Sequence, residues 1–165
     1  MLQIAIATTR KLAGILSSES GMPAAVTAIS SQQGLMLPAI TPRQIISQNV
    51  APDLVERSTA SKYPLIYVYC GKLVNDLREK FRTFSGDAEM IVEARISQDR
   101  IDNTDTYLHA YVDAIACVLD NNRGDWGDGV FYCGGYQVTF GGVKQGGRNF
   151  IQIAKVSFVV EVSTN

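Results

Sequence analysis

The sequence predicts an α+β fold: an open antiparallel β-sheet packed on one main α-helix, preceded by N-terminal helices and a Pro-rich linker. Three observations predict it. One strongly amphipathic stretch lies in the second half of the chain, a cleanly alternating strand precedes it, and three strand-like runs separated by glycine turns follow it. Strands joined by such short turns pair antiparallel. The amphipathic helix is therefore expected to cover one face of the sheet.

The first 33 residues are expected to be helical in two pieces. Apolar residues recur at helical spacing in the first piece, and the sequence Gly21-Met22-Pro23 interrupts it. Pro23 suits the start of a second helix and Gly34 suits its end. The second helix has only a thin apolar face, which indicates packing against something larger.

Residues 34–64 are expected to form a long ordered linker, because four prolines are spaced through polar residues. Only a short helix around residues 43–48 is expected there. Long segments of this kind are usually functional or disordered, and the scattered apolar side chains favour docking on a surface of this chain or of a neighbouring subunit. These side chains are Leu35, Leu37, Ile40, Ile45, Ile46 and Val50. We therefore expect a helical extension and linker over residues 1–62, and an α+β domain over residues 63–165.

The domain is expected to begin with two strands. The β-branched and aromatic run LIYVYC, residues 65–70, predicts a buried strand. Residues 88–97 alternate, which predicts a strand with one solvent-facing side. The charged residues on that side are Glu89, Glu93 and Arg95. The intervening residues 71–86 are ambiguous, because three apolar residues fall at helical spacing within a charged stretch.

The main helix is expected over residues 104–119, where apolar residues recur at intervals of four, three and four. Asp102, Asn103 and Asp105 suit its start as cap and first-turn residues. Residues 130–133, 136–140 and 150–162 then predict three strands separated by glycine-rich turns.

The second face of the predicted sheet is only partly polar. Four apolar residues lie on nominally outer positions of its strands: Ile91, Ile151, Ile153 and Val159. An apolar second face requires a partner. The N-terminal helices, the linker and an adjacent copy of the chain are the candidates.

Composition excludes several classes of protein. The chain has 165 residues and a formal net charge of -1, so it has no overall positive field to hold duplex nucleic acid. Its N-terminus lacks the basic start of a signal peptide, and no apolar run approaches the ~18 residues that cross a bilayer. We expect no membrane contact, synthesis in the host cytoplasm and three buried free thiols, Cys70, Cys117 and Cys133.

The sequence offers little for catalysis, so no catalytic residue, cofactor or metal ligand is predicted. His109 is the only histidine, and it is expected to be a structural side chain of the main helix. No Cys or His spacing typical of a zinc site is present. The glycine-rich segments match neither phosphate-binding fingerprint, and they are expected to form hairpin turns and bulges.

Three exposed segments are the candidates for protein contacts. The ambiguous charged segment contributes Arg78, Lys80 and Arg82. The turn after the main helix contributes Arg123, Asp125 and Trp126, of which Trp126 either folds onto the core or anchors an interface. The glycine-rich tip before the last strand contributes Lys144 and Arg148, which suit a charge-complementary contact.

Several segments between Tyr63 and Ser163 resemble the tail terminator and neck proteins of tailed bacteriophages. The resemblance is carried by YPLIYVYCGKL, LREKFRTFSG, VEARISQDR, YVDAIACVLDNNRGDWGDGVFYCGGYQVTFG and GGRNFIQIAKVSFVVEVS. It implies an α+β virion protein at the head–tail junction that assembles as a homohexameric ring. The ring would end polymerisation of the tail-tube protein and offer a surface to head-completion proteins. Members of this family have no active site, so the resemblance implies no catalytic residue in this chain.

Three alternatives to a tail terminator stay open at this point. The first is a neck or head-completion protein that binds directly to the portal or connector and lines the DNA channel. The second is a small-molecule-binding or enzymatic domain with the half-apolar sheet face as the floor of its pocket. The third is a nucleic-acid-associated protein that touches passing DNA in a ring lumen.

Overall fold

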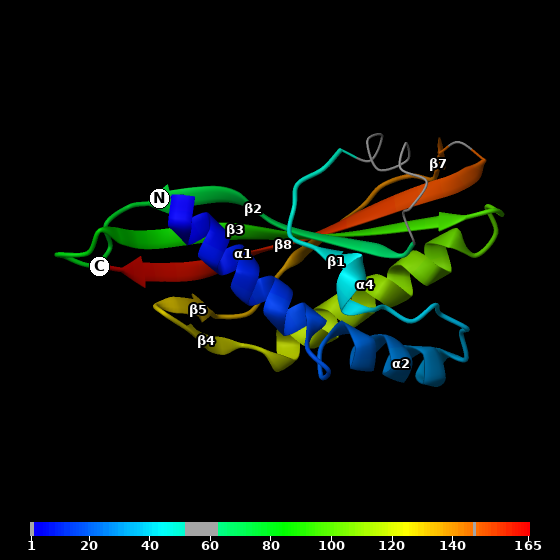
Figure 1. The fold of residues 1–165 in the computed structure, drawn as a ribbon, viewed down its shortest axis with the longest axis horizontal. Coiled ribbons are helices and arrows are strands. Elements are labelled where there is room, and N and C mark those ends of the chain that lie inside the picture. The colour runs from blue at the N-terminus through cyan, green and yellow to red at the C-terminus, as the bar shows by residue number, and fades with distance from the viewer. Residues whose placement is uncertain (1, 52–62, 147) are drawn as a thin grey trace.

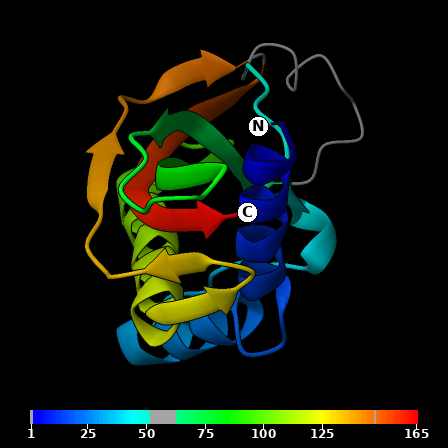
Figure 2. The same cartoon turned by 90° about the vertical axis from the view of Figure 1, so that its left-hand side faces the viewer.

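The structure, a computed structural model, describes residues 2–51, 63–146 and 148–165. Its helices are α1 (Leu2–Ser17), α2 (Met22–Gln33) and α4 (Thr104–Asn121), with a short 3-10 turn, η1 (Pro42–Gln44). Its strands are β1 (Ile45–Ile46), β2 (Leu65–Asn75), β3 (Phe84–Gln98), β4 (Gly124–Gly127), β5 (Val130–Tyr132), β6 (Gln137–Phe140), β7 (Lys144–Gly146) and β8 (Asn149–Thr164). The helices lie on one side of a single curled sheet (Figures 1 and 2), which confirms the α+β prediction.

The antiparallel pair of β3 and β8 forms the centre of the sheet. Strand β2 pairs with the other edge of β3, and β1 adds to β2. On its far side, β8 pairs in turn with β7, β6 and β5, which together act as one interrupted strand, and β4 closes a hairpin with β5. The predicted sheet was wholly antiparallel, but the sheet is mixed because β1 pairs parallel with β2.

The face of the sheet toward the helices, the inner face, carries the core. Even-numbered residues of β3 and β8 lie opposite each other on this face, from Ala88 opposite Val160 to Ala94 opposite Ala154, and they are fully buried. Helix α4 packs on both strands through Leu108, Ile115 and Leu119, as its spacing predicts. The inner face is therefore closed by a helix that is apolar toward the sheet and polar toward solvent.

The N-terminal helices belong to the same core. Leu12 and Leu16 of α1 have no exposed surface and join the cluster that includes the inner face of the sheet. Met22 and Val26 of α2 join it beside α4. A single hydrophobic core thus contains side chains from both predicted parts of the chain.

The linker docks on its own chain, passing from one face of the sheet to the other. Ile40 is buried in the core on the helix side. Beyond β1, Ile46 and Val50 pack against the outer face, where Tyr67 and Tyr69 form a second apolar cluster. This confirms that the linker covers part of the apolar second face. Residues 52–62, which include Pro52 and the predicted boundary at 62, lie outside the described residues.

The segment 71–86, for which the sequence made no choice, is not helical: β2 and β3 extend into it and a loop of residues 76–83 joins them. Other local predictions were wrong. The turn regions at 124–127 and 144–146 form strands β4 and β7. The thiols of Cys117 and Cys133 are exposed, although all three cysteines are free.

The shared core predicts that α1 contributes as much to stability as the central helix. Replacing the fully buried Leu16 by Ala should lower the free energy of unfolding by about 2–5 kcal/mol, because it leaves a cavity at the sheet. The matched control is Ile6→Ala on the same helix, where the side chain is 47% exposed. Urea denaturation followed by circular dichroism measures both. A wild-type curve with two transitions, or equal effects of the two substitutions, would contradict a single core.

Candidate functional site

The predicted contact residues lie in separate places along the sheet. The loop that carries Arg78, Lys80 and Arg82 follows β2 and lies beside the C-terminal end of β8, where Thr83 donates its backbone N–H to Thr164. Lys144 pairs instead with Ile151 near the start of β8. At about 3.3 Å per strand residue, these ends are roughly 40 Å apart. They form two surfaces at opposite ends of the long axis (Figure 1).

Ion pairs and hydrogen bonds order the loop of residues 76–83. Arg78 bridges two carboxylates, donating to Asp76 Oδ2 at 2.9 Å and Asp87 Oδ1 at 2.8 Å. Arg82 donates to Glu79 at 3.2 Å and to Asn165 at 2.7 Å. The side chain of Lys80 is exposed on the same loop. These contacts fix the loop as a defined surface.

The same loop presents apolar side chains to solvent. Phe81 is 100% exposed and Leu77 is 59% exposed. Both have positive φ angles, 65° and 50°, a region that side-chain-bearing residues adopt at an energetic cost. Asn75 stabilises the loop, since its side chain accepts from the Ser85 N–H at 3.1 Å and donates to the Thr83 carbonyl at 3.1 Å. An ordered loop that exposes a whole aromatic ring is typical of a protein-contact surface.

The second predicted segment lies at the β4–β5 hairpin. The Trp126 ring packs on the core, 5.6 Å from the Tyr132 ring, and its Nε1 donates to the Asn122 carbonyl at 2.7 Å. Asp125 accepts from the Gly127 N–H at 2.7 Å, which closes the turn locally. Arg123 is exposed and pairs with Asp120 at 2.7 Å. Trp126 therefore holds the hairpin on the core, whereas Arg123 and Asp125 stay on the surface.

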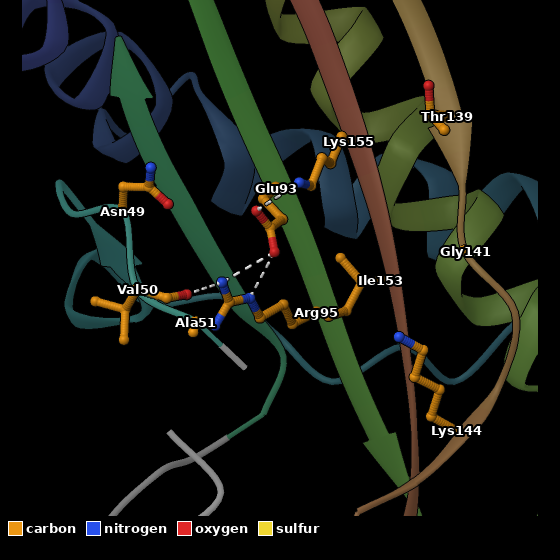
Figure 3. Close-up of a pocket in the computed structure, with 10 residues that line it drawn as sticks. All are labelled: Asn49, Val50, Ala51, Glu93, Arg95, Thr139, Gly141, Lys144, Ile153 and Lys155. Carbon is orange, nitrogen blue, oxygen red and sulfur yellow. Dashed lines mark hydrogen bonds and ion pairs between the residues drawn. The ribbon is translucent and has the colours of Figure 1, made fainter. Parts of the chain in front are cut away.

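A pocket on the outer face of the sheet contains a buried ion pair that the sequence did not predict. Arg95 and Glu93 of β3 were expected to face solvent, but they are only 1% and 3% exposed. Arg95 Nε donates to Glu93 Oε1 at 2.9 Å, and its Nη2 donates to the Val50 carbonyl of the linker. The prediction was wrong because the linker covers this part of the face (Figure 3).

Aromatic residues of β2 complete the burial of this ion pair. The Arg95 guanidinium lies 4.0 Å from the centre of the Tyr67 ring, within cation–π range. The Tyr69 hydroxyl donates to Glu93 Oε2 at 3.0 Å. Burial, followed by the charge of Glu93 and this hydrogen bond, raises the pKa of Tyr69 to about 12. The alternation of tyrosines on β2 opposite charges on β3 was the sequence signal for this cluster, but it does not reveal the covering linker.

The pocket carries an excess of positive charge. It has a volume of about 430 Å³, and its cations are Arg95, Lys144 and Lys155 against the single carboxylate of Glu93. Lys155 Nζ lies 4.0 Å from Glu93 Oε2, and its side chain is half exposed at the mouth. Lys144, a predicted contact residue, is exposed on β7, and Arg148 is exposed in the turn that follows but does not line the pocket. The arrangement suits an acidic group.

The remaining titratable groups are dispersed over the described residues. His109 is exposed on α4, with its ring 4.6 Å from that of Phe140. Within residues 2–51, 63–146 and 148–165, no three His, Cys, Asp or Glu side chains are grouped so that they could hold a metal ion. No described helix is long and apolar enough to cross a membrane.

Comparison with known proteins does not assign this chain to a family. A scan against models of protein families finds no match to this chain, and a search of curated proteins finds none either. Function must therefore be argued from the surfaces described above.

The buried ion pair predicts an unequal response to single and double substitutions. Glu93→Gln should lower the free energy of unfolding by about 3–5 kcal/mol, because it leaves the Arg95 charge buried without a counter-ion. Adding Arg95→Met should recover part of that loss. Chemical denaturation measures both variants, with the exposed Glu161→Gln as a control that changes stability by less than about 0.5 kcal/mol. Equal losses in the single and double variants would contradict a coupled pair.

The raised pKa of Tyr69 predicts that its hydroxyl ionises at a higher pH than that of an ordinary tyrosine. Its folded pKa of about 12 exceeds the ordinary value near 10, so the fold favours the neutral phenol. This contribution to stability is fully present below pH about 10 and is lost as pH rises through about 12. Ultraviolet titration of wild type minus Tyr69→Phe should give a difference curve with its midpoint near pH 12. A midpoint near 10 would show that the hydroxyl is neither buried nor held by Glu93.

Proposed function

We propose that this chain is a structural subunit of a tailed bacteriophage, of the tail terminator or neck kind. In this proposal it forms a homohexameric ring at the head-proximal end of the tail. The ring ends polymerisation of the tail-tube protein and joins the tail to the head, and the chain catalyses no reaction.

The observation that carries the proposal of a contact role is the ordered loop between β2 and β3. Phe81 is completely exposed there, although a free aromatic side chain in water gains nothing for folding. The loop also adopts positive φ angles at Phe81 and Leu77 while ion pairs hold its base. Such a surface supports binding to another protein, with Phe81 as the anchor.

The phage assignment is supported by the resemblance of the segments between Tyr63 and Ser163. The element order of residues 63–165, a long sheet with one main helix on it, agrees with the α+β domain that the resemblance implies. One of the resembling segments, LREKFRTFSG, includes the exposed loop residues Leu77 and Phe81.

A ring end-cap works through closure and mismatch. Each copy contacts the next through two different surfaces and is rotated relative to it by a fixed angle. When a whole number of these rotations makes a full turn, the copies close into a ring and cannot grow into a filament. One end of the ring binds the last ring of the tube. The other end of the ring lacks the surface that would bind a further ring of the tube, so it stays available to a head-completion or connector protein. In this chain the two ends of the sheet supply such surfaces, with the Phe81 loop at one end and Arg148 in the turn before β8 at the other.

Tube capping is the direct test. The purified chain, mixed with assembling tail-tube protein from the same phage genome, should add a ring to one end of each tube and stop its growth, as seen by electron microscopy. Phe81→Ser should lower the fraction of capped tubes at least tenfold without changing the circular dichroism spectrum. The matched control is Tyr136→Ser, an exposed aromatic away from the loop.

Three outcomes would contradict parts of the proposal. Tubes that grow to the same length with and without the chain would exclude tail termination. Binding to the portal protein but not to the tube would favour the neck role over the terminator role. Equal loss of capping in both aromatic variants would remove the loop from the contact.

A further inference from the structure

Helix α4 presents an acidic surface on the helix layer of the molecule. The segment from Ile101 to Asn122 contains no Lys or Arg, and its acidic residues are Asp102, Asp105, Asp113 and Asp120. Asp113 is exposed one turn beyond His109, on the side of α4 that faces away from the core. We call Asp105, His109 and Asp113 the α4 stripe. Phe140, 46% exposed and packed on His109, adds an apolar side chain beside it.

The opposite layer of the molecule presents the basic pocket. The pocket opens on the outer face of the sheet, whereas α4 packs on the inner face. Lys144 and Lys155 stand at its mouth, and Arg95 lies beneath them (Figure 3). Among the described residues, Arg95 Nη1 is buried without a hydrogen-bond partner. Glu93 is shared between Arg95 and Lys155, so one carboxylate serves two cations.

We propose that the basic pocket of one copy of this chain receives the α4 stripe of a second copy. The inference rests on the proposed function, because it names the surfaces by which neighbouring subunits of the ring meet. Asp113 reaches Lys144 and Lys155 at the mouth. The buried Arg95 acts through its charge, since its side chain is covered by the linker and Tyr67.

Charge complementarity favours a second copy over duplex DNA. A DNA duplex needs cations spread along its phosphates, whereas here three cations surround one concave site and the chain carries a net charge of -1. The chain itself supplies the matching partner, a helix side with the carboxylates of Asp105 and Asp113 and no Lys or Arg. The apolar neighbours are also paired, with Phe140 beside the stripe and the half-buried Ile153 in the pocket.

The geometry makes the contact head-to-tail. Each copy has one pocket and one stripe on different layers, so every copy can receive one neighbour and be received by another. This is a heterologous contact, the kind that generates rings when it closes. A two-fold dimer through either surface alone would place like charges against each other.

The test uses two neutralised variants of the full chain. Lys144→Gln/Lys155→Gln removes the receiving charges, and Asp113→Asn removes the inserted one; Asp105 is left unchanged, because its Oδ1 accepts from the buried Gln152 Nε2 at 2.5 Å. Sedimentation equilibrium should show the wild type associating beyond a dimer, while each variant alone associates at least tenfold more weakly. An equimolar mixture should form dimers and nothing larger, because it contains only one intact kind of contact. Lys72→Gln and Glu19→Gln are the matched controls, since both side chains are exposed elsewhere, and they should behave as wild type.

The outcomes separate this inference from the proposed function. A wild-type chain that stays monomeric up to about 1 mM overturns the contact between copies, and so does a mixture that behaves as its separate components. A pocket variant that loses affinity for a DNA duplex, with self-association unchanged, assigns the pocket to nucleic acid. Capping of tail tubes by a chain that fails these tests leaves the proposed function intact with another ring interface.

Discussion

The unbroken pairing of β3 with β8 is the constraint on which the rest of the structure depends. Its register runs without a shift from Phe84 opposite Thr164 to Gln98 opposite Phe150. Because side chains alternate along a strand, this single register sends every even-numbered residue to the helices and every odd-numbered residue to the outer face. The core residues that face α4 and the pocket residues on the outer face therefore depend on the same register. A shift of the pairing by one residue would move each set to the opposite face of the sheet.

The parts of the fold that were predictable are those where one local pattern dominates. The spacing of Leu108, Ile115 and Leu119 identified α4 because a helix against a sheet needs one apolar stripe. The alternation in β8 identified its inner face for the same reason. By contrast, β7 is a three-residue strand whose pairing depends on where Asn149–Thr164 lies, and no property of its own sequence requires it. Whether such a short segment forms a strand depends on the position of the strand beside it.

The candidate site shows why surface function is harder to predict than the core. Glu93 and Arg95 alternate with apolar residues, which normally indicates the solvent side of a strand. They are buried because the linker crosses over them. Val50 of the linker, whose carbonyl accepts from Arg95, lies 45 residues earlier in the chain. Lys144 was a predicted contact residue, but its sequence neighbours say nothing of Lys155 or Arg95. The pocket exists only through contacts between segments that are distant in the chain.

The buried ion pair also explains why the two layers of the molecule can differ in charge without loss of stability. A cluster of cations on a bare sheet face would repel itself, but Glu93 lies among them and Tyr67 and Tyr69 close the sides. The excess charge is then confined to one concave place and not spread over the face. On the other layer, α4 carries its carboxylates on the exposed side of a helix, where water screens them. In the proposed contact, the basic pocket and the α4 stripe lie on different layers of one chain, so only a neighbouring copy in a fixed orientation can bring them together.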